Sequence, residues 1–183
     1  PPLFVSRVGR MDPAGLACVT TAAGIVRYHW HDMEHRYPAA LRTVRDRDRD
    51  RDSAPSASPP GGGGGGGGCC ETAVLIDLEG LSAAHASSHV LAVIRSQTEL
   101  DALCYPQTLR RMAIVNAPPF FWATWAMVRR WIDPRSASRV TVLGGRGTGT
   151  DGWGTELLDL VGGDPALLPR EKKLRRYKTG CIV

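Results

Sequence analysis

The sequence lacks the short motifs that mark common catalytic and metal-binding proteins. Its five cysteines are odd in number and form no C-x-x-C pair, which argues against a disulfide framework and suits a reducing compartment. It has no G-x-S-x-G elbow and no phosphate-binding P-loop, and its Ser, His and Asp residues follow no persuasive triad order. We therefore expect no catalytic residue, no metal, no cofactor and no covalent chemistry.

Lysine is missing from residues 1–171, although the chain is basic overall. All three lysines lie in the segment 170–178, REKKLRRYK, which carries +5, the net charge of the whole chain. Because no basic stripe crosses the rest of the chain, nucleic acid is not an expected partner. The segment is either a solvated terminal helix or a contact for anionic membrane, to which each cation near the surface contributes roughly 1 kcal/mol. The candidate membrane contacts are Lys172, Lys173, Arg175 and Arg176.

An apolar run long enough to cross a membrane is also missing. The uncharged stretch 112–128 would reach only about 25 Å as a helix, which is short of a hydrocarbon core of about 30 Å. Asn116 and the pair Pro118-Pro119 interrupt it as well. We therefore predict a strand, a turn and then a helix that begins at the prolines.

The chain shows an alternation of strand and helix patterns. Strands are predicted at 3–8, 72–78, 111–116 and 139–143, and helices at 18–44, 83–103, 119–132 and 154–161. The near-continuous apolar character of 72–78 indicates a strand buried on both faces. The alternation predicts one α/β domain with a mainly parallel sheet.

Residues 45–70 are of low complexity. They consist of alternating Arg and Asp, a Ser/Ala/Pro segment and eight consecutive Gly. Such a composition cannot build a core, so we predict a disordered surface loop that interrupts the domain.

The predicted helix 119–132 is unusually apolar. Its large side chains are Phe120, Phe121, Trp122, Trp125, Met127, Trp131 and Ile132. They do not fall on one narrow face, and they offer more apolar surface than a short surface helix needs. The helix is either a well-packed core helix or the lining of an apolar pocket.

Four segments in a fixed order resemble a known family. The central one runs from Tyr105-Pro106 through Asn116-Ala-Pro118 and the aromatic helix to Asp133-Pro134 and the strand ending at Gly144. The others are Pro2–Gly9, Val26–Glu34 and Val74–Gly80. The resemblance covers most of residues 2–44 and 71–168. In content and order these segments resemble the CRAL-TRIO lipid-exchange domain, and most closely its secretory phosphatidylinositol/phosphatidylcholine-transfer branch.

The resemblance implies an α/β fold with a mainly parallel β-sheet, whose helices form an apolar lipid pocket closed by a mobile gate helix. Residues 1–168 would form this domain, without the family's N-terminal helical domain, and 169–183 a basic C-terminal tail. The helix 119–132 would be the gate. The implied pocket and gate residues are Val74, Ile76, Ile114, Phe120, Phe121, Trp122, Trp125, Val128, Trp131 and Ile132.

The resemblance also implies a site for the lipid head group. Arg139 stands where phosphatidylinositol-binding relatives have Lys, and Gln107 where they have Glu. Arg can still pair with phosphate, often through two hydrogen bonds, whereas Gln loses the negative charge. Thr72 and Tyr28 complete the candidate head-group set. Alternatively, Gln107 and Arg139 are ordinary surface polar residues.

The expected function is to bind one hydrophobic lipid, expected to be a phospholipid, and to exchange or present it between membranes. The bound lipid would be the ligand of a monomer that touches anionic membrane transiently. The resemblance places it in the cytoplasm, peripherally on Golgi or other endomembranes. One alternative is a scaffold or regulator that senses lipid without exchanging it.

Two other motifs keep chemical alternatives open. Gly147–Gly152 spells G-x-G-x-x-G between a predicted strand and a helix, which is the context of a nucleotide-binding loop. However, no later strand supplies the acidic residue such a site needs. His31 to His35 matches H-x-x-E-H, a zinc-protease pattern, but no third ligand is apparent.

Overall fold

A parallel sheet forms the centre of the fold. The computed structural model describes residues 2–52, 71–144, 154–160 and 180–182. Within them the strands are β1 (Leu3–Ser6), β2 (Thr72–Asp77), β3 (Leu109–Ala117), β4 (Val140–Gly144) and β5 (Gly180–Ile182). Their order is β4-β3-β2-β1-β5; the first four are parallel and β5 pairs antiparallel with β1. The predicted α/β fold with a mainly parallel sheet is confirmed.

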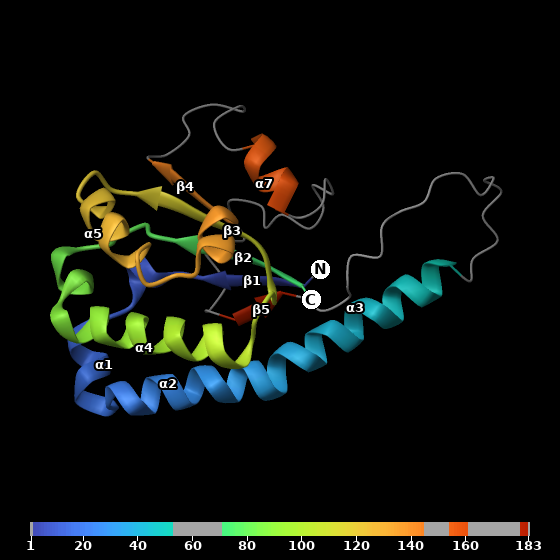
Figure 1. The fold of residues 1–183 in the computed structure, drawn as a ribbon, viewed down its shortest axis with the longest axis horizontal. Coiled ribbons are helices and arrows are strands. Elements are labelled where there is room, and N and C mark those ends of the chain that lie inside the picture. The colour runs from blue at the N-terminus through green and yellow to red at the C-terminus, as the bar shows by residue number, and fades with distance from the viewer. Residues whose placement is uncertain (1, 53–70, 145–153, 161–179, 183) are drawn as a thin grey trace.

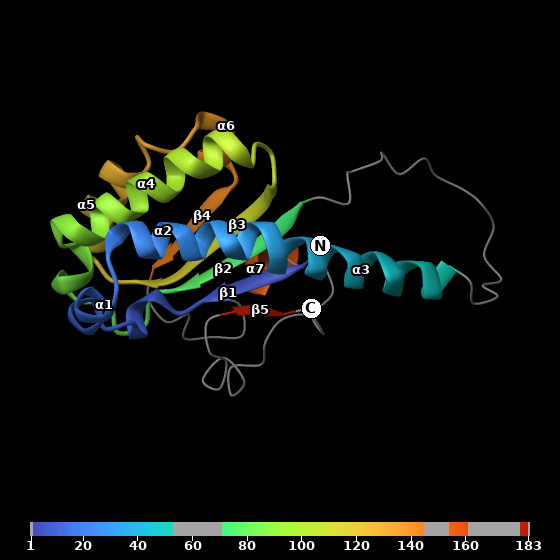
Figure 2. The ribbon, with the colours of Figure 1, turned by 90° about the horizontal axis from the view of Figure 1, so that it is seen from below.

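Most of the described helices lie on one side of this sheet. They are α1 (Pro13–Val19), α2 (Ala22–His31), α3 (Tyr37–Asp52), α4 (Ser88–Cys104), α5 (Phe121–Val128), α6 (Pro134–Ser138) and α7 (Gly154–Leu160). Figures 1 and 2 show α2 and α4 side by side under one face, with α7 on the other. Because successive strands step in one direction and their connections are right-handed, the connecting helices gather on the same face.

The predicted helix 18–44 is broken and also longer than expected. The Thr21 side chain caps α2 by accepting from the Gly24 amide at 3.1 Å, and a π-helical turn at Asp32–Arg36 joins α2 to α3. The prediction that 45–52 belongs to a disordered loop is wrong, because α3 continues through Asp52 and extends past the sheet (Figure 1). Alternating Arg and Asp place opposite charges three positions apart but like charges four positions apart, so the charge spacing does not by itself explain this extension. Residues 53–70 lie outside the described residues.

The predicted gate helix is shorter than 119–132. It is α5, which ends at Val128, and the chain then turns into α6. Asp133 caps α6 by accepting from the amides of Arg135 and Ser136 at 3.0 and 3.1 Å, and these hydrogen bonds lower the pKa of its carboxyl. The residue before a proline disfavours the helical conformation, which excludes Asp133 from α5, and Arg129–Asp133 forms the turn between α5 and α6. Trp131 and Ile132 therefore lie in the connection.

The strands bury their two faces to different extents. In β2, Ala73 and Leu75 are each 1% exposed and share a core with Leu157 and Leu160 of α7. Val74 and Ile76 point to the opposite, helix-covered face and are only half-buried. The predicted burial of this strand on both faces is thus confirmed for the face of Ala73 and Leu75 and wrong for the face of Val74 and Ile76, which remains half-buried.

Candidate functional site

The face of the sheet under the helices carries a strip of half-buried apolar side chains. In β1 and β2 the residues on this face are Phe4, Ser6, Val74 and Ile76, and all four are half-buried. Their neighbours on the other face are fully buried. Figures 1 and 2 show α2 and α4 on the side of the sheet that this face of β1 and β2 looks toward. Apolar residues that stay accessible beneath covering helices indicate that the space between the two layers is incompletely filled.

Helix α5 closes one part of this face. Phe121 and Trp125 stack with ring centroids 6.5 Å apart, and both pack against the core around Ile114. The predicted pocket residues Ile76 and Ile114 thus lie against the inner side of α5. Val128, Trp131 and Ile132 are half-buried. By contrast, Phe120 and Trp122 are exposed, so the predicted gate residues divide between an inner and an outer side.

Three of the predicted head-group residues share one edge of the sheet. Thr72 begins β2, Gln107 precedes β3 and Arg139 precedes β4, so the parallel strands bring them to the same amino-terminal edge. The buried Thr72 hydroxyl donates to the Thr108 carbonyl at 3.0 Å. Gln107 is exposed and has a left-handed φ of 63°.

Arg139 is held in place at this edge. Its guanidinium donates to the carbonyl oxygen of Leu109 and lies 3.5 Å from the carboxylate of Glu71. About a third of the side chain remains exposed. Arg139 can therefore meet an anion at the edge, but the anion would compete with Glu71.

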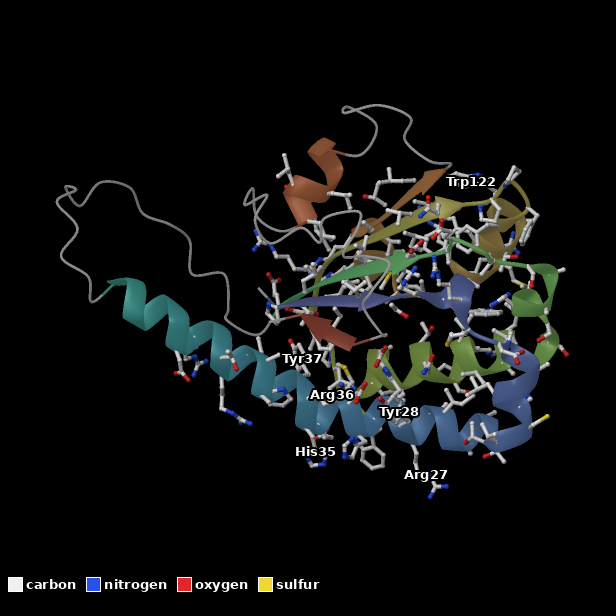
Figure 3. The ribbon with its side chains drawn as sticks, turned by 180° about the vertical axis from the view of Figure 1, so that it is seen from behind. Arg27, Tyr28, His35, Arg36, Tyr37 and Trp122 are labelled. Carbon is white, nitrogen blue, oxygen red and sulfur yellow. The ribbon has the colours of Figure 1, made fainter. Side chains whose placement is uncertain are left out.

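Tyr28 is not brought to this edge. Its side chain is 60% exposed on the outer side of α2, where its hydroxyl accepts a hydrogen bond from Arg36 at 3.1 Å. Figure 3 shows Tyr28 beside Arg36 and far from Trp122. The four head-group candidates therefore do not form one cluster.

The carboxyl-terminal edge holds a buried polar cluster that sequence reasoning missed. Asp77, at the end of β2, accepts from Asn116 Nδ2 at 2.8 Å and from the Glu79 amide at 2.9 Å. The buried Arg7 lies 3.6 Å from Asp77, and Arg10 donates to Glu79 at 2.9 Å. The cluster thus ties together the ends of β1, β2 and β3.

Asn116 gives this cluster its link to α5. Its φ of 58° is left-handed, and the register between β3 and β4 shifts between Ile114 and Ala117. Asn tolerates this conformation better than most residues. The sequence signal was the run Asn116-Ala-Pro118, which we interpreted as a break in the apolar stretch and as part of the family resemblance, without a contact for Asn116. The hydrogen bond to Asp77 fixes the segment that leads into α5.

Two glycines in the resembling segments make the same cluster possible. Gly80 has a φ of 91°, which side-chain-bearing residues rarely adopt. A Cβ on Gly9 would lie 2.4 Å from the Glu79 carbonyl oxygen, so only glycine allows this approach. The glycines of Pro2–Gly9 and Val74–Gly80 therefore serve the turns at the ends of β1 and β2.

An open cleft of about 490 Å³ lies beside the polar cluster. It is lined by Glu79, Gly80, Asn116, Ala117, Pro118, Pro119, Trp122 and Gly144. The carboxyl ends of parallel strands are the usual ligand-binding edge of α/β sheets. Of the predicted gate residues, Trp122 lines this cleft. The cleft therefore lies where α5 begins.

Two side-chain pairs join the helices of the outer layer. His29 of α2 and Asp101 of α4 are 2.7 Å apart, and this hydrogen bond raises the pKa of His29. The Tyr105 hydroxyl donates to Glu34 at 2.5 Å; partial desolvation and this hydrogen bond raise the pKa of Tyr105 to about 12. Both pairs hold α2 and its π-helical turn against α4.

The alternative motifs gain no support. The rings of His31 and His35 lie 4.5 Å apart, but no group of three potential metal ligands occurs in the part of the chain that the structure describes. Gly147–Gly152 and the tail residues Lys172, Lys173, Arg175 and Arg176 lie outside the described residues. The stretch 112–128 forms β3 and α5, and no described helix is long and apolar enough to cross a membrane.

The one-sided helical layer and the half-buried apolar face define an α/β domain built around an apolar interior. The profile of the CRAL/TRIO domain matches residues 1–151. The chain belongs to this family, which confirms the resemblance seen in the sequence.

The chain is similar to several curated proteins at low identity. It is 26% identical to the phosphatidylinositol/phosphatidylcholine transfer protein SFH9 of Arabidopsis thaliana, over 92% of this chain and 25% of that protein. It is 26% identical to SFH11 of the same plant, over 92% of this chain and 38% of that protein. It is 27% identical to protein real-time of Anopheles gambiae, over 79% of this chain and 18% of that protein. The chain thus spans about a quarter of the length of the first of these relatives.

Among solved structures, the crystal structure of Sfh5 matches 40% of this chain and 26% of its own chain, with 19% identity and a TM-score of 0.39.

Proposed function

We propose that this chain binds one lipid, a phospholipid, between its sheet and its helical layer and exchanges or presents it between membranes. The half-buried strip of Phe4, Val74 and Ile76 beneath α2 and α4 carries the proposal. Each methylene removed from water contributes about 0.8 kcal/mol, so an acyl chain laid along this strip would be held strongly. Membership of the CRAL/TRIO family and similarity to proteins named as phospholipid transfer proteins support it.

The head group would lie at the amino-terminal edge of the sheet. Arg139 lies at this edge, and its planar guanidinium suits a phosphate. Binding would require the phosphate to displace or share the contact between Arg139 and Glu71. Gln107 is exposed nearby and can donate or accept a hydrogen bond without adding negative charge. This arrangement favours a phosphate-bearing lipid over a neutral one.

Helix α5 would act as the movable element. Phe121 and Trp125 seal the inner side, and the connection 129–133 separates α5 from α6. Movement of α5 about this connection and about Pro118-Pro119 would open the apolar layer to a membrane. The proposed place of work, which follows only from the family resemblance, is the cytoplasmic surface of endomembranes.

The decisive experiment is to identify the passenger in the purified protein. Native mass spectrometry, followed by lipid extraction, should find about one phospholipid bound per chain. The matched variants are Val74→Phe, which adds bulk to the half-buried strip, and Leu75→Phe, which adds the same ring to the fully buried face.

The two variants show whether the half-buried face is a lipid cavity or part of a packed core. Val74→Phe should lose the passenger and keep its stability, because the ring would occupy space meant for the lipid. Leu75→Phe should lose about 1–3 kcal/mol of unfolding free energy, as overpacking does. If the native protein stays empty after incubation with liposomes, or if both variants are destabilised alike, the lipid cavity is not there.

A further inference from the structure

Two neighbouring histidines have no part in the core or in the proposed lipid site. His31 ends α2, His35 lies in the π-helical turn Asp32–Arg36, and both side chains are exposed. Their ring centroids are 4.5 Å apart, and within the described residues neither ring takes part in a hydrogen bond or an ion pair. Figure 3 shows His35 on the side of the helix that faces away from the sheet. We call these two residues the His31–His35 pair.

A second histidine pair has the same spacing but a different environment. The Ser82 amide donates to Nδ1 of His85 at 3.1 Å, and Nε2 of His85 donates to the Met11 carbonyl oxygen at 2.9 Å. Both ring nitrogens of His85 are therefore used. His89 is exposed four residues later, without a second available imidazole at this spacing. Of the two pairs, only the His31–His35 pair can turn a nitrogen of each ring toward a common ligand.

The acidic residues of the π-helical turn are already engaged. Asp32 accepts from Arg36 at 3.2 Å, and Glu34 accepts from the Tyr105 hydroxyl at 2.5 Å. The two histidines of the H-x-x-E-H pattern therefore have no third protein ligand, in agreement with the absence of any three-ligand group from the described residues. This excludes a closed structural zinc site and a zinc-protease centre. It leaves a site with two protein ligands, completed by water.

We propose that the His31–His35 pair binds one divalent transition-metal ion through its two imidazoles. Histidine nitrogens lie about 2.0–2.1 Å from such an ion, so two of them are at most about 4.2 Å apart. Rings with centroids 4.5 Å apart meet this limit after small rotations of the two exposed side chains. The bound ion would join the end of α2 to the π-helical turn, a kind of turn that is frequent at functional sites. The site is separate from lipid binding and does not depend on it.

Isothermal titration calorimetry of the full chain, purified without a polyhistidine tag, tests the proposal. Ni²⁺ is the probe, because imidazole suits it and because, unlike Cu²⁺, it does not oxidise the exposed Cys18 and Cys104. The native chain should bind about one Ni²⁺ and should not bind Mg²⁺, which prefers oxygen ligands. His31→Gln and His35→Gln should each weaken Ni²⁺ binding by at least about tenfold, since even the loss of an outer-shell partner costs that much.

A matched variant makes the result specific. His89→Gln also removes one exposed histidine, but from the pair whose other ring is used, so it should bind Ni²⁺ like the native chain. Ni²⁺ should raise the melting temperature of the native chain and of His89→Gln, because the ion binds the folded turn. It should leave the melting temperature of His31→Gln unchanged. Without metal, all these variants should melt like the native chain, since the side chains they replace are exposed.

Three outcomes overturn the proposal. The first is a native chain that shows no saturable binding of Ni²⁺. The second is native-like binding by the double variant His31→Gln with His35→Gln, which would place the ion elsewhere. The third is an equal loss in His89→Gln and in His31→Gln, which would mean that single histidines bind independently. The proposed function is judged separately by the passenger, because neither histidine lies in the half-buried strip.

Discussion

Asp77 shows how one buried carboxylate can organise the end of a sheet. It accepts from Asn116 and the Glu79 amide while facing Arg7, and Arg7 and Asp77 are both buried. The Nε of Arg7 has no hydrogen-bond partner among the described residues, so its charge depends on Asp77 and, at 3.9 Å, on Glu79. Removing Asp77 would leave a buried cation with one distant partner.

We therefore predict that Asp77→Ala lowers the free energy of unfolding by about 3–5 kcal/mol, the cost of breaking a buried ion pair from one side. Urea denaturation measures it. The matched control is Glu99→Ala, which breaks the exposed pair with Arg95 on α4 and should cost less than about 0.5 kcal/mol. Similar losses in the two variants would show that the Asp77 cluster adds nothing beyond a surface pair.

The cluster also marks a limit of sequence reasoning at the residue scale. The glycines and Asp77 stood in segments that resemble a family, but the sequence could not say which residues they meet. Asn116 and Asp77 are 39 positions apart, and their contact exists only once β2 and β3 pair. The amino-terminal edge was different. Thr72 begins β2, and Gln107 and Arg139 precede β3 and β4, so a parallel sheet alone predicts that they share an edge.

At the scale of elements, local chemistry explains both the successes and the errors. The apolar runs predicted β2, β3 and β4 because they are short and contain β-branched residues. The end of α5 was missed although Asp133-Pro134 is a visible signal for a new helix start. The extension of α3 through Asp52 was missed because low-complexity composition was taken to exclude a helix. β5 was not expected, since three residues at the edge of β1 carry almost no pattern of their own.

The stability that the contact between α2 and α4 contributes should depend on pH through His29. The hydrogen bond to Asp101 raises its pKa above the ordinary value of 6.5. A raised histidine pKa stabilises the folded state below pH 6.5, and this contribution is lost as the pH rises through the folded-state pKa. We therefore predict that His29→Gln costs more stability near pH 6 than near pH 9.

Urea denaturation at the two pH values measures this difference. Asp101 is partly exposed, so solvent screening will keep the effect modest. His89→Gln is the control, because His89 is exposed on α4, the helix that carries Asp101. A cost for His29→Gln that is independent of pH, or one that grows toward pH 9, would contradict the assigned role of the His29–Asp101 pair.

At the scale of the whole molecule, the two faces of the sheet differ in how completely the chain covers them. The α7 side of the sheet is closed by the chain itself, with Leu75 and Leu160 fully buried. The helix-covered side keeps Val74 and Ile76 accessible. If a lipid completes that side, the folded state and the lipid stabilise each other, because the ligand binds the native chain and not the unfolded one.

We therefore predict that the lipid-loaded protein melts about 5–10 °C above the same protein stripped of lipid, which corresponds to binding at roughly 100 times the Kd for a domain of this size. Differential scanning calorimetry of the two forms measures it. In Val74→Phe the two preparations should melt together, because the added ring replaces the lipid. Re-adding phospholipid should restore the higher melting temperature in the native chain alone. Loaded and stripped native protein melting at one temperature would mean that the chain closes both faces of its sheet unaided, and the half-buried strip would then be ordinary loose packing.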